Sequence, residues 1–389
     1  MQDDLTSPAV LISTVHDKIS HLIATDLTRR GVRVEGIGSQ CPPALRLSRL
    51  LTRFHAAPPL DDTARFVDRV CEVVRERRLT MFLPSCTEVN RLASFQPRLA
   101  EEANYPFTND RIVSAVSNKA ELAILAEQCG VATPRTLAAD SADALDHTSQ
   151  LRFPLIYKPS HSCDSNGLGI AATPDALCRA MARKTGYVVQ EYIDGPLFVW
   201  NGVFRNGRLY AVFTFEAIRT SPALCGVSVM RRSIHLPHLD TLAMRLLGSI
   251  GYEGFCTLDF LRNRPDGRYL LIDCNPRFPS SIHASLDAGI SFPWVLLCLT
   301  LGRECPPCDY LDGITSVSVS GHVSRLFRRR PGGPGFPRLL GETLAALRWI
   351  HRSEESYLLR PFPFAGQFFS VTKDVCNQTK RLAGQPVRF

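Results

Sequence analysis

The sequence lacks a run of apolar residues long enough to cross a membrane, and residues 1–10 lack the basic start and hydrophobic stretch of an export signal. It also holds only six lysines, so the formal net charge of +8 is carried almost wholly by arginine. Neither an aromatic and basic face for nucleic acid nor a paired lipid signal is visible. We therefore expect a cytoplasmic protein with no integral membrane segment and no nucleic-acid partner.

Two common nucleotide-binding motifs are also missing. No GxGxxG follows the first predicted strand, and the small-residue loop at 160–170 has no GK[ST], so neither a dinucleotide fingerprint nor a Walker A motif is present. Thirteen cysteines, an odd number scattered mostly through apolar stretches, indicate reduced thiols rather than a disulfide framework. The single CxxC, Cys305 to Cys308, has no second pair or histidine cluster, which favours a proline-rich connection over a zinc site.

The 389 residues are enough for two or three domains, and 45% hydrophobic residues with 21% charged ones are typical of a globular protein. In the first 115 residues, predicted strands alternate with predicted helices, which indicates a parallel sheet in a small α/β domain. We expect the strands at 9–13, 31–37 and 81–84 and the helices at 19–29, 63–77 and 88–100.

Residues 251–278 form the most informative stretch, because they read as a β-hairpin that carries charged side chains. Two alternating segments, 255–261 and 269–274, flank the turn signal Pro265-Asp266-Gly267. A turn centred on Asp266 puts Asp259 opposite Asp273. The same register pairs apolar residues on the core face, Leu258 with Cys274 and Phe260 with Ile272.

Opposed carboxylates on neighbouring strands lie roughly 5 Å apart at Cβ and repel each other unless a cation lies between them. Mg²⁺ is the natural candidate, because it takes oxygen ligands from one or two carboxylates and from substrate phosphates. Asn275 follows Asp273 on the same strand face and can add its amide oxygen, and Arg277 can bind phosphate or carboxylate with two hydrogen bonds. At this point an ordinary hairpin with solvated aspartates stays an open alternative.

A second site candidate is the loop at 160–170, which follows a predicted strand at 153–159 that carries Lys158. Such a loop can donate backbone N–H groups to phosphates while the lysine adds a charge, although a Ser/Gly loop is often only a connection. A predicted strand at 187–193 and a hairpin around Asn206-Gly207 follow, then a helix at 240–250.

Two further features leave alternatives open. Arg231 and Arg232 either reach a substrate carboxylate or belong to a solvated strand face. The tail from about 320 combines a basic run, Arg325 to Arg330, with a predicted helix at 339–350. We expect the tail to dock on the core or on a partner, with weak attachment to an anionic membrane or to nucleic acid as the alternative.

Taken in order, five short motifs resemble the ATP-grasp superfamily, and especially its carbamoyl-phosphate-synthase-like carboxylate-amine ligases. The resemblance runs over about residues 9–302 and implies a mixed α/β and α+β fold, with a parallel-sheet pre-ATP-grasp domain before a two-lobed ATP-grasp fold. The implied parts are the pre-ATP-grasp domain at 1–115, the small lid lobe at 116–195, the large catalytic lobe at 196–319 and a basic extension at 320–389. The motifs are Ser117-Asn-Lys119, Tyr157-Lys-Pro159, Val189-Gln-Glu-Tyr-Ile-Asp-Gly195, Gly254-Phe-Cys-Thr-Leu-Asp-Phe260 and Leu271-Ile-Asp-Cys-Asn-Pro-Arg277.

The resemblance also implies roles for single residues, with ATP and Mg²⁺, or Mn²⁺ in its place, as cofactors. Catalysis would rest on Arg277 and Lys158, and Arg277 would bind substrate, with Arg231 as the further substrate candidate given by its own strand. The metal ligands would be Asp259, Asp273 and Asn275. The nucleotide would be bound by Lys119, Lys158, Ser165, Gly167, Gln190, Glu191, Ile193 and Asp194.

The resemblance implies a ligase that forms an amide or peptide-like bond through an acyl phosphate, from a small-molecule carboxylate and an amine. Two departures from the family matter: Asp273 stands where a glutamate is usual, and Leu197 stands where many members have an acid near the ribose. The alternative is a degenerate family member that binds nucleotide or serves as a scaffold subunit without ligase activity. A homodimer stays open as the assembly.

Overall fold

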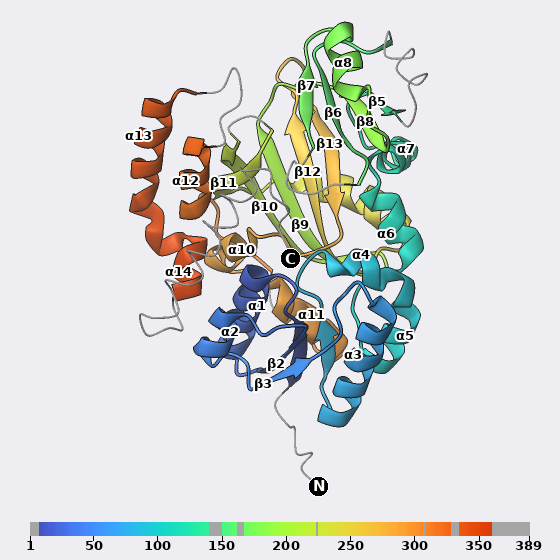
Figure 1. The fold of residues 1–389 in the computed structure, drawn as a ribbon, viewed down its shortest axis with the longest axis vertical. Coiled ribbons are helices and arrows are strands. Elements are labelled where there is room, and N and C mark those ends of the chain that lie inside the picture. The colour runs from blue at the N-terminus through green and yellow to red at the C-terminus, as the bar shows by residue number, and fades with distance from the viewer. Residues whose placement is uncertain are drawn as a thin grey trace.

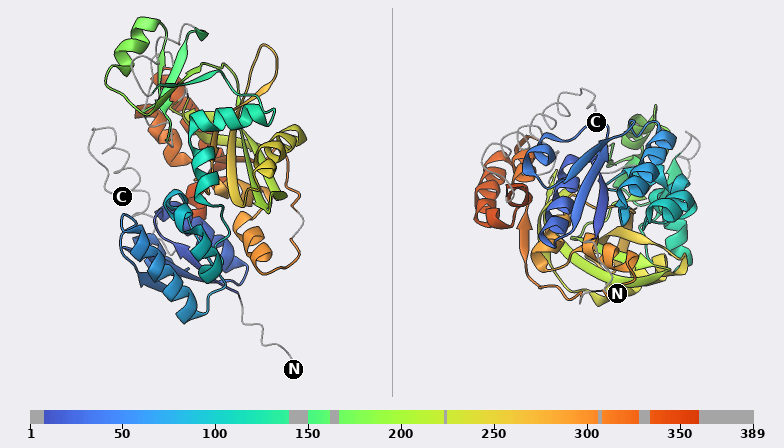
Figure 2. Two further views of the ribbon diagram at one scale, coloured as in Figure 1. Left: turned by 90° about the vertical axis from the view of Figure 1, so that its right-hand side faces the viewer. Right: turned by 90° about the horizontal axis from the view of Figure 1, so that it is seen from below.

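The computed structural model describes residues 8–139, 150–161, 167–222, 225–305, 308–327 and 334–359. Three sheets follow one another along the longest axis of the molecule (Figure 1). A parallel sheet lies at one end and a small antiparallel sheet at the other, with a six-stranded sheet between them, and the side view in Figure 2 shows the same order. The predicted mixed fold class is therefore confirmed.

The N-terminal sheet is parallel, in the order β3-β2-β1-β4, as predicted from the alternation of strands and helices. All five residues of β1 are buried, because helices cover both faces of this sheet. The predicted helix at 88–100 is broken, since Pro97 starts a new helix in the first turn of α5. The strands are β1 (Ala9–Ser13), β2 (Arg33–Gly38), β3 (Arg53–Ala56) and β4 (Met81–Leu83). The helices are α1 (Asp17–Arg29), α2 (Pro43–Ser48), α3 (Thr63–Arg77), α4 (Glu88–Leu92), η1 (Ala93–Phe95), α5 (Gln96–Ala103) and α6 (Asp110–Ser117).

The small antiparallel sheet has the order β5-β8-β6-β7. It follows helix α7 (Lys119–Gln128), which begins where the Asn118 side chain accepts hydrogen bonds from the N–H groups of Ala120 and Glu121 at 2.9 and 3.4 Å. Its other elements are β5 (Thr136–Ala139), β6 (Leu155–Pro159), β7 (Gly169–Ala171), α8 (Pro174–Met181) and β8 (Tyr187–Glu191).

The large sheet is antiparallel, in the order β13-β12-β9-β10-β11-β14. Asn206 and Gly207 have φ angles of 51° and 71°, so they form the predicted two-residue hairpin turn between β9 and β10. The strands are β9 (Leu197–Arg205), β10 (Arg208–Ser221), β11 (Val227–Ser233), β12 (Gly254–Arg262), β13 (Tyr269–Asn275) and β14 (Thr315–Val317), and the predicted helix at 240–250 consists of α9 (Pro237–Ala243) and the π-helix η3 (Met244–Gly248).

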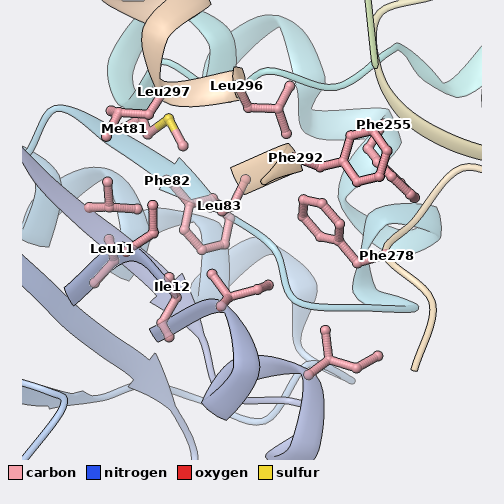
Figure 3. Packing of buried hydrophobic residues seen from close by; sticks show 14 of the residues in the cluster. Leu11, Ile12, Met81, Phe82, Leu83, Phe255, Phe278, Phe292, Leu296 and Leu297 are labelled. Carbon is pink, nitrogen blue, oxygen red and sulfur yellow. The ribbon is translucent and has the colours of Figure 1, made fainter. Parts of the chain in front are cut away.

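One hydrophobic core joins the parallel sheet to the β12–β13 hairpin (Figure 3). Phe255 on β12 packs against Phe278, just after β13, with ring centroids 4.7 Å apart. It also packs against Phe292 of α11 (Phe292–Thr300), at 4.9 Å. Residues of β1 and β4 complete the same cluster, so the hairpin is held rigidly relative to the N-terminal sheet.

The C-terminal segment packs along the edge of the large sheet that ends in β11 and β14 (Figure 1). Its helices are α10 (Ile282–Ala288), α12 (Val319–Phe327), α13 (Phe336–Ala346), η4 (Leu347–Arg352) and α14 (Glu354–Leu359). Glu355 of α14 accepts hydrogen bonds from the N–H groups of Val319 and Ser320 at the start of α12. The described tail is therefore docked on the core, as predicted.

In the parts of the chain that the structure describes, no helix taken alone has the length and apolar character of a membrane span. The pair α10 and α11, bent by 86°, passes that test when the two are joined.

Two glycines with different surroundings give a prediction about stability. A Cβ at Gly195, between β8 and β9, would overlap the carbonyl of Arg262, whereas a Cβ at Gly341 in α13 meets open space. Gly195→Ala should therefore lower the free energy of unfolding by about 1–3 kcal/mol. Gly341→Ala should raise it by about 1 kcal/mol, because alanine is the better helix former. Thermal melting of both variants checks this, and equal melting temperatures would contradict it.

Candidate functional site

The β12–β13 hairpin brings the two predicted carboxylates together. Asp259 lies opposite Asp273 in the antiparallel register, and Leu258 lies opposite Cys274, as predicted. Both aspartates are half-buried and line the same cavity, while Leu258 and Cys274 face the core. The alternation of polar and apolar residues therefore places the two like charges side by side on the face of the hairpin that lines the cavity.

The pairing shifts one residue further along, where Phe260 lies opposite Leu271 and not opposite Ile272. That part of the predicted register is wrong, because β13 carries one extra residue at a bulge. Ile272 is the extra residue, and its carbonyl accepts a hydrogen bond from Lys158 Nζ at 2.9 Å. The bulge thus gives the lysine of the neighbouring lobe an anchor beside the two carboxylates.

Two lysines reach this point from different elements. Lys158 lies near the end of β6 and Lys119 at the first position of α7, and both side chains are buried. Lys119 Nζ lies 3.3 Å from a carboxylate oxygen of Asp273. Burial lowers the pKa of Lys158 to about 8, against the opposite effect of Asp273. An anion bound here would favour the charged form of Lys158.

The electrostatics of the aspartate pair also favour a bound cation. Burial, and then the charge of Asp273, raise the pKa of Asp259 to about 7, although Lys158, Arg277 and Lys119 act in the opposite direction. A carboxyl whose pKa is near neutral has too little positive charge around it to offset its burial and the repulsion from its neighbour. A divalent cation between the strands would remove that repulsion.

The donor set fits a hard divalent cation with few protein ligands. Among the described residues, no three His, Cys, Asp or Glu side chains are placed to share a metal ion. The candidate set is instead Asp259, Asp273 and the amide of Asn275, which lies opposite Thr257 two residues beyond Asp273. All of these are oxygen donors, which suits Mg²⁺ or Mn²⁺ with substrate oxygens completing the shell.

Arg277 joins this site to the N-terminal sheet. Its Nη2 donates to Asn275 Oδ1 at 3.3 Å, and its Nη1 lies 3.8 Å from the sulfur of Cys86, which follows β4. Neither Arg277 nor Asn275 lines the large cavity described next.

A cavity of about 970 Å³ opens between the small and the large sheets. This volume is at the upper end of the range for small-molecule sites. Of the predicted site residues, eight line it: Lys119, Lys158, Gln190, Glu191, Ile193, Asp194, Asp259 and Asp273. Gly167, with a φ of 73°, lies against Pro159 and Tyr187 outside the lining, and Ser165 lies outside the described residues.

The segment 190–194 enters the cavity at the junction of the lobes. The side chain of Gln190 donates to Thr136 Oγ1 at 2.8 Å, and that of Glu191 accepts from the N–H of Arg152 at 3.0 Å. Because these two side chains hold the sheet together, residues 190 and 191 can offer a ligand mainly their backbone, whereas Ile193 and Asp194 also line the cavity.

The structure does not bring Arg231 to this cavity. Its side chain is 1% exposed, and its Nη1 lies 3.1 Å from His283 Nε2 and 3.9 Å from Glu354 of α14. Lys18 of α1 also pairs with Glu354. The carboxylate that pairs with Arg231 is therefore Glu354 of the chain itself. The expectation that Arg231 reaches a substrate carboxylate is wrong, because its guanidinium is buried away from the cavity.

Residues from the C-terminal segment line the cavity and were not expected there. Arg325 of α12, and Arg338 and Glu342 of α13, form part of its wall, together with Arg219 of β10. The basic run from Arg325 was visible in the sequence. Its place beside β10 could not be predicted, because the sequence of a tail does not indicate which part of the core it packs against.

Comparison with known proteins is consistent with this geometry. A family model described as an ATP-grasp domain matches residues 116–281. The D-alanine–D-alanine ligase of Methylococcus capsulatus is 29% identical over 186 residues, which are 42% of this chain and 58% of that one. The N-terminal section of the carbamoyl phosphate synthase large chain of Methanopyrus kandleri is 24% identical over 180 residues, 41% of this chain and 31% of that one. The matched part is thus less than two thirds of either relative.

Among solved structures, an ADP complex of PurK, an N5-carboxyaminoimidazole ribonucleotide synthetase, superposes with a TM-score of 0.67. The superposition covers 89% of this chain and 98% of that one at 12% sequence identity, so it shows the shared fold alone. The resemblance to the ATP-grasp superfamily predicted from the five motifs is confirmed.

The raised pKa of Asp259, about 7, predicts how stability depends on pH. A carboxyl with a higher pKa in the folded than in the unfolded chain binds its proton more tightly when folded, so stability falls as pH rises from about 4 to about 7. Asp259→Asn should therefore melt about 2–6 °C above the wild type at pH 8 in chelator, and at about the same temperature at pH 4.

The control is Asp266→Asn on the exposed turn of the same hairpin. The Arg268 backbone N–H lowers the pKa of Asp266, so this variant should not gain stability at pH 8. A wild type and Asp259→Asn that melt together at pH 8 would show that the two carboxylates do not repel each other.

The buried contacts of Glu354 give a second prediction. Glu354→Gln leaves Arg231 and Lys18 without their shared carboxylate, which should cost about 3–5 kcal/mol of stability. Glu127→Gln on the exposed face of α7 is the control and should change stability by less than about 0.5 kcal/mol. Urea unfolding of both variants measures the difference, and two equally stable variants would contradict a structural role for Glu354.

Proposed function

Residues 116–281 form a domain of the ATP-grasp family, and from this premise we propose that the chain is an ATP-dependent carboxylate-amine ligase. It would form an amide or peptide-like bond and release ADP and phosphate. The observation that carries the proposal is the meeting of two opposed carboxylates, Asp259 and Asp273, with two buried lysines in one cavity. The name of one relative, D-alanine–D-alanine ligase, supports the class of bond.

The reaction has two steps. A carboxylate oxygen of the first substrate attacks the γ-phosphorus of ATP, the bond from that phosphorus to the bridging oxygen breaks, and ADP leaves. The amine nitrogen of the second substrate then attacks the acyl carbon, the carbon–oxygen bond to the phosphoryl group breaks, and phosphate leaves with that electron pair. The proton of the amine passes to solvent.

The residues of the chain would hold the charges of these steps in place. Lys119 and Lys158 would bind the phosphates, since both are buried and lie beside the carboxylate pair. Asp259, Asp273 and Asn275 would hold Mg²⁺ or Mn²⁺, which when bound would stabilise negative charge on the transferring phosphoryl group.

Substrate and nucleotide would be positioned from the two sides of the cavity. The backbone of residues 190–193 would read the adenine, with Asp194 near the ribose where Leu197 offers no polar group. Arg277, which lies outside the lining of the cavity, would bind the acyl phosphate, because Asn275 fixes its guanidinium.

One observation favours a second candidate, a nucleotide-binding or scaffold subunit without ligase activity. Lys119 pairs with Asp273, and Arg277 binds Asn275, so two of the three metal ligands have partners within the chain. Asp273 is also one methylene shorter than the glutamate usual in the family, which shortens its reach toward two metal ions.

Metal-dependent nucleotide binding is the first prediction to test. A ligand present at 100 times its Kd raises the free energy of unfolding by about 2.7 kcal/mol. MgATP should therefore raise the Tm of the wild type by about 5 °C, and ATP with chelator should raise it much less. Asp273→Asn should lose the metal-dependent part, while Asp266→Asn should keep it. A Tm that MgATP does not change would contradict the nucleotide site.

Turnover separates the two candidates. With carboxylate and amine pairs that release ADP in the wild type, Asp259→Asn and Asp273→Asn should abolish ADP formation, and Lys158→Ala should weaken ATP binding about tenfold or more. A protein that binds MgATP but releases no ADP with any pair of a broad panel would favour the scaffold subunit. Full turnover in both aspartate variants would overturn the metal assignment.

A further inference from the structure

Three arginines of the cavity wall share a single carboxylate. Arg325, Arg338 and Arg219 lie 2.7, 3.2 and 3.6 Å from the carboxylate oxygens of Glu342. We call these three residues the arginine wall. Arg325 and Arg338 come from the consecutive helices α12 and α13, and Arg219 comes from β10, far away in the sequence.

The arginine wall carries more positive charge than its partner neutralises. The side chain of Arg325 is 5% exposed, and its Nε has no hydrogen-bond partner among the described residues. Burial lowers the pKa of Arg219, Glu342 acts in the opposite direction, and the neighbouring arginines 325, 348 and 338 lower it further. Among the described residues, three guanidinium groups pair with one carboxylate, which is unfavourable in a partly buried place unless an anion joins them.

The arginine wall is separate from the place proposed for the transferring phosphate. In the register of the sheet, Asp259 lies opposite Val199, and Val199 lies opposite Phe215 of β10. Arg219 is four residues further along β10, and one of these, Ile218, is extra at a bulge, so the step is about 10 Å along the strand and about 10 Å across two strand spacings. The backbone of Arg219 therefore lies well away from the two aspartates.

We propose that the arginine wall binds an anionic group, carboxylate or phosphate, on a substrate that lies in the same cavity as the nucleotide. This inference rests on the proposed function and narrows the substrate to an extended molecule, because the backbones of Asp259 and Arg219 lie on the order of 14 Å apart. Guanidinium groups suit this task, since each binds a carboxylate or phosphate with two parallel hydrogen bonds. The C-terminal segment thus supplies part of substrate recognition.

The test titrates two probes, tricarballylate and inorganic pyrophosphate, into the full chain saturated with ADP in excess Mg²⁺. Calorimetry should show binding of at least one probe. Binding of tricarballylate indicates a carboxylate site, and binding of pyrophosphate indicates a phosphate site. Arg338→Gln, at an exposed position of the wall, should weaken the binding about tenfold. Glu342→Gln should tighten it, because it removes the competing carboxylate, and a merely structural role would not produce that gain.

Two controls keep the outcome specific. Arg352→Gln removes the same charge from the same segment but neither lines the cavity nor acts on Arg219, so it should leave probe binding unchanged. Lys158→Ala reports on the phosphate site, with MgADP raised about tenfold so that the chain stays saturated. Probe binding that is weakened in Lys158→Ala but not in Arg338→Gln would place the probe at the phosphate site and overturn the proposal. The absence of binding of either probe to the wild type would also overturn it.

The nucleotide is titrated first, which separates the two claims. If MgADP does not bind, the proposed function fails, and the arginine wall is then tested with the same variants without nucleotide. If MgADP binds and the probes do not, the proposed function stands and the arginine wall is not an anion site.

Discussion

The repulsion between Asp259 and Asp273 is the constraint around which the site is organised. Antiparallel pairing puts the two carboxylates directly opposite each other, on a hairpin whose other face is buried in the core. Such a pair is unfavourable by itself, and positive groups surround it: Lys119, Lys158 and Arg277 all act on Asp259. The lysines belong to the neighbouring lobe, so the same charges that stabilise the pair also bring the two lobes together.

Much of this could be predicted from the sequence, because the apolar alternation of β12 and β13 dictates which residues oppose each other. The register between Asp259 and Asp273 followed from the turn at Asp266 and from the core face. The bulge at Ile272 could not be predicted, since an extra residue leaves the local pattern unchanged until the strands are paired. Its carbonyl is nevertheless the anchor of Lys158.

The position of the C-terminal segment on the rest of the molecule is the feature that the sequence indicates least. Its amphipathic helix and basic run indicated a docked tail, but long-range packing decides where such a tail lies. The structure gives it two charged contacts of different kinds. Glu354 is buried with Arg231 and Lys18 and holds the tail to the N-terminal and large sheets, while Glu342 lies at the cavity among three arginines. The first contact completes the fold, and the second changes the chemistry of the cavity.

The central claim is that the opposed carboxylates hold a divalent metal ion together with a nucleotide. Electron paramagnetic resonance of free Mn²⁺, titrated with protein in the presence of ADP, tests it most directly. The account predicts that the wild type removes at least one Mn²⁺ per chain from solution and that Asp259→Asn removes much less. Equal removal of Mn²⁺ by the two proteins would contradict it.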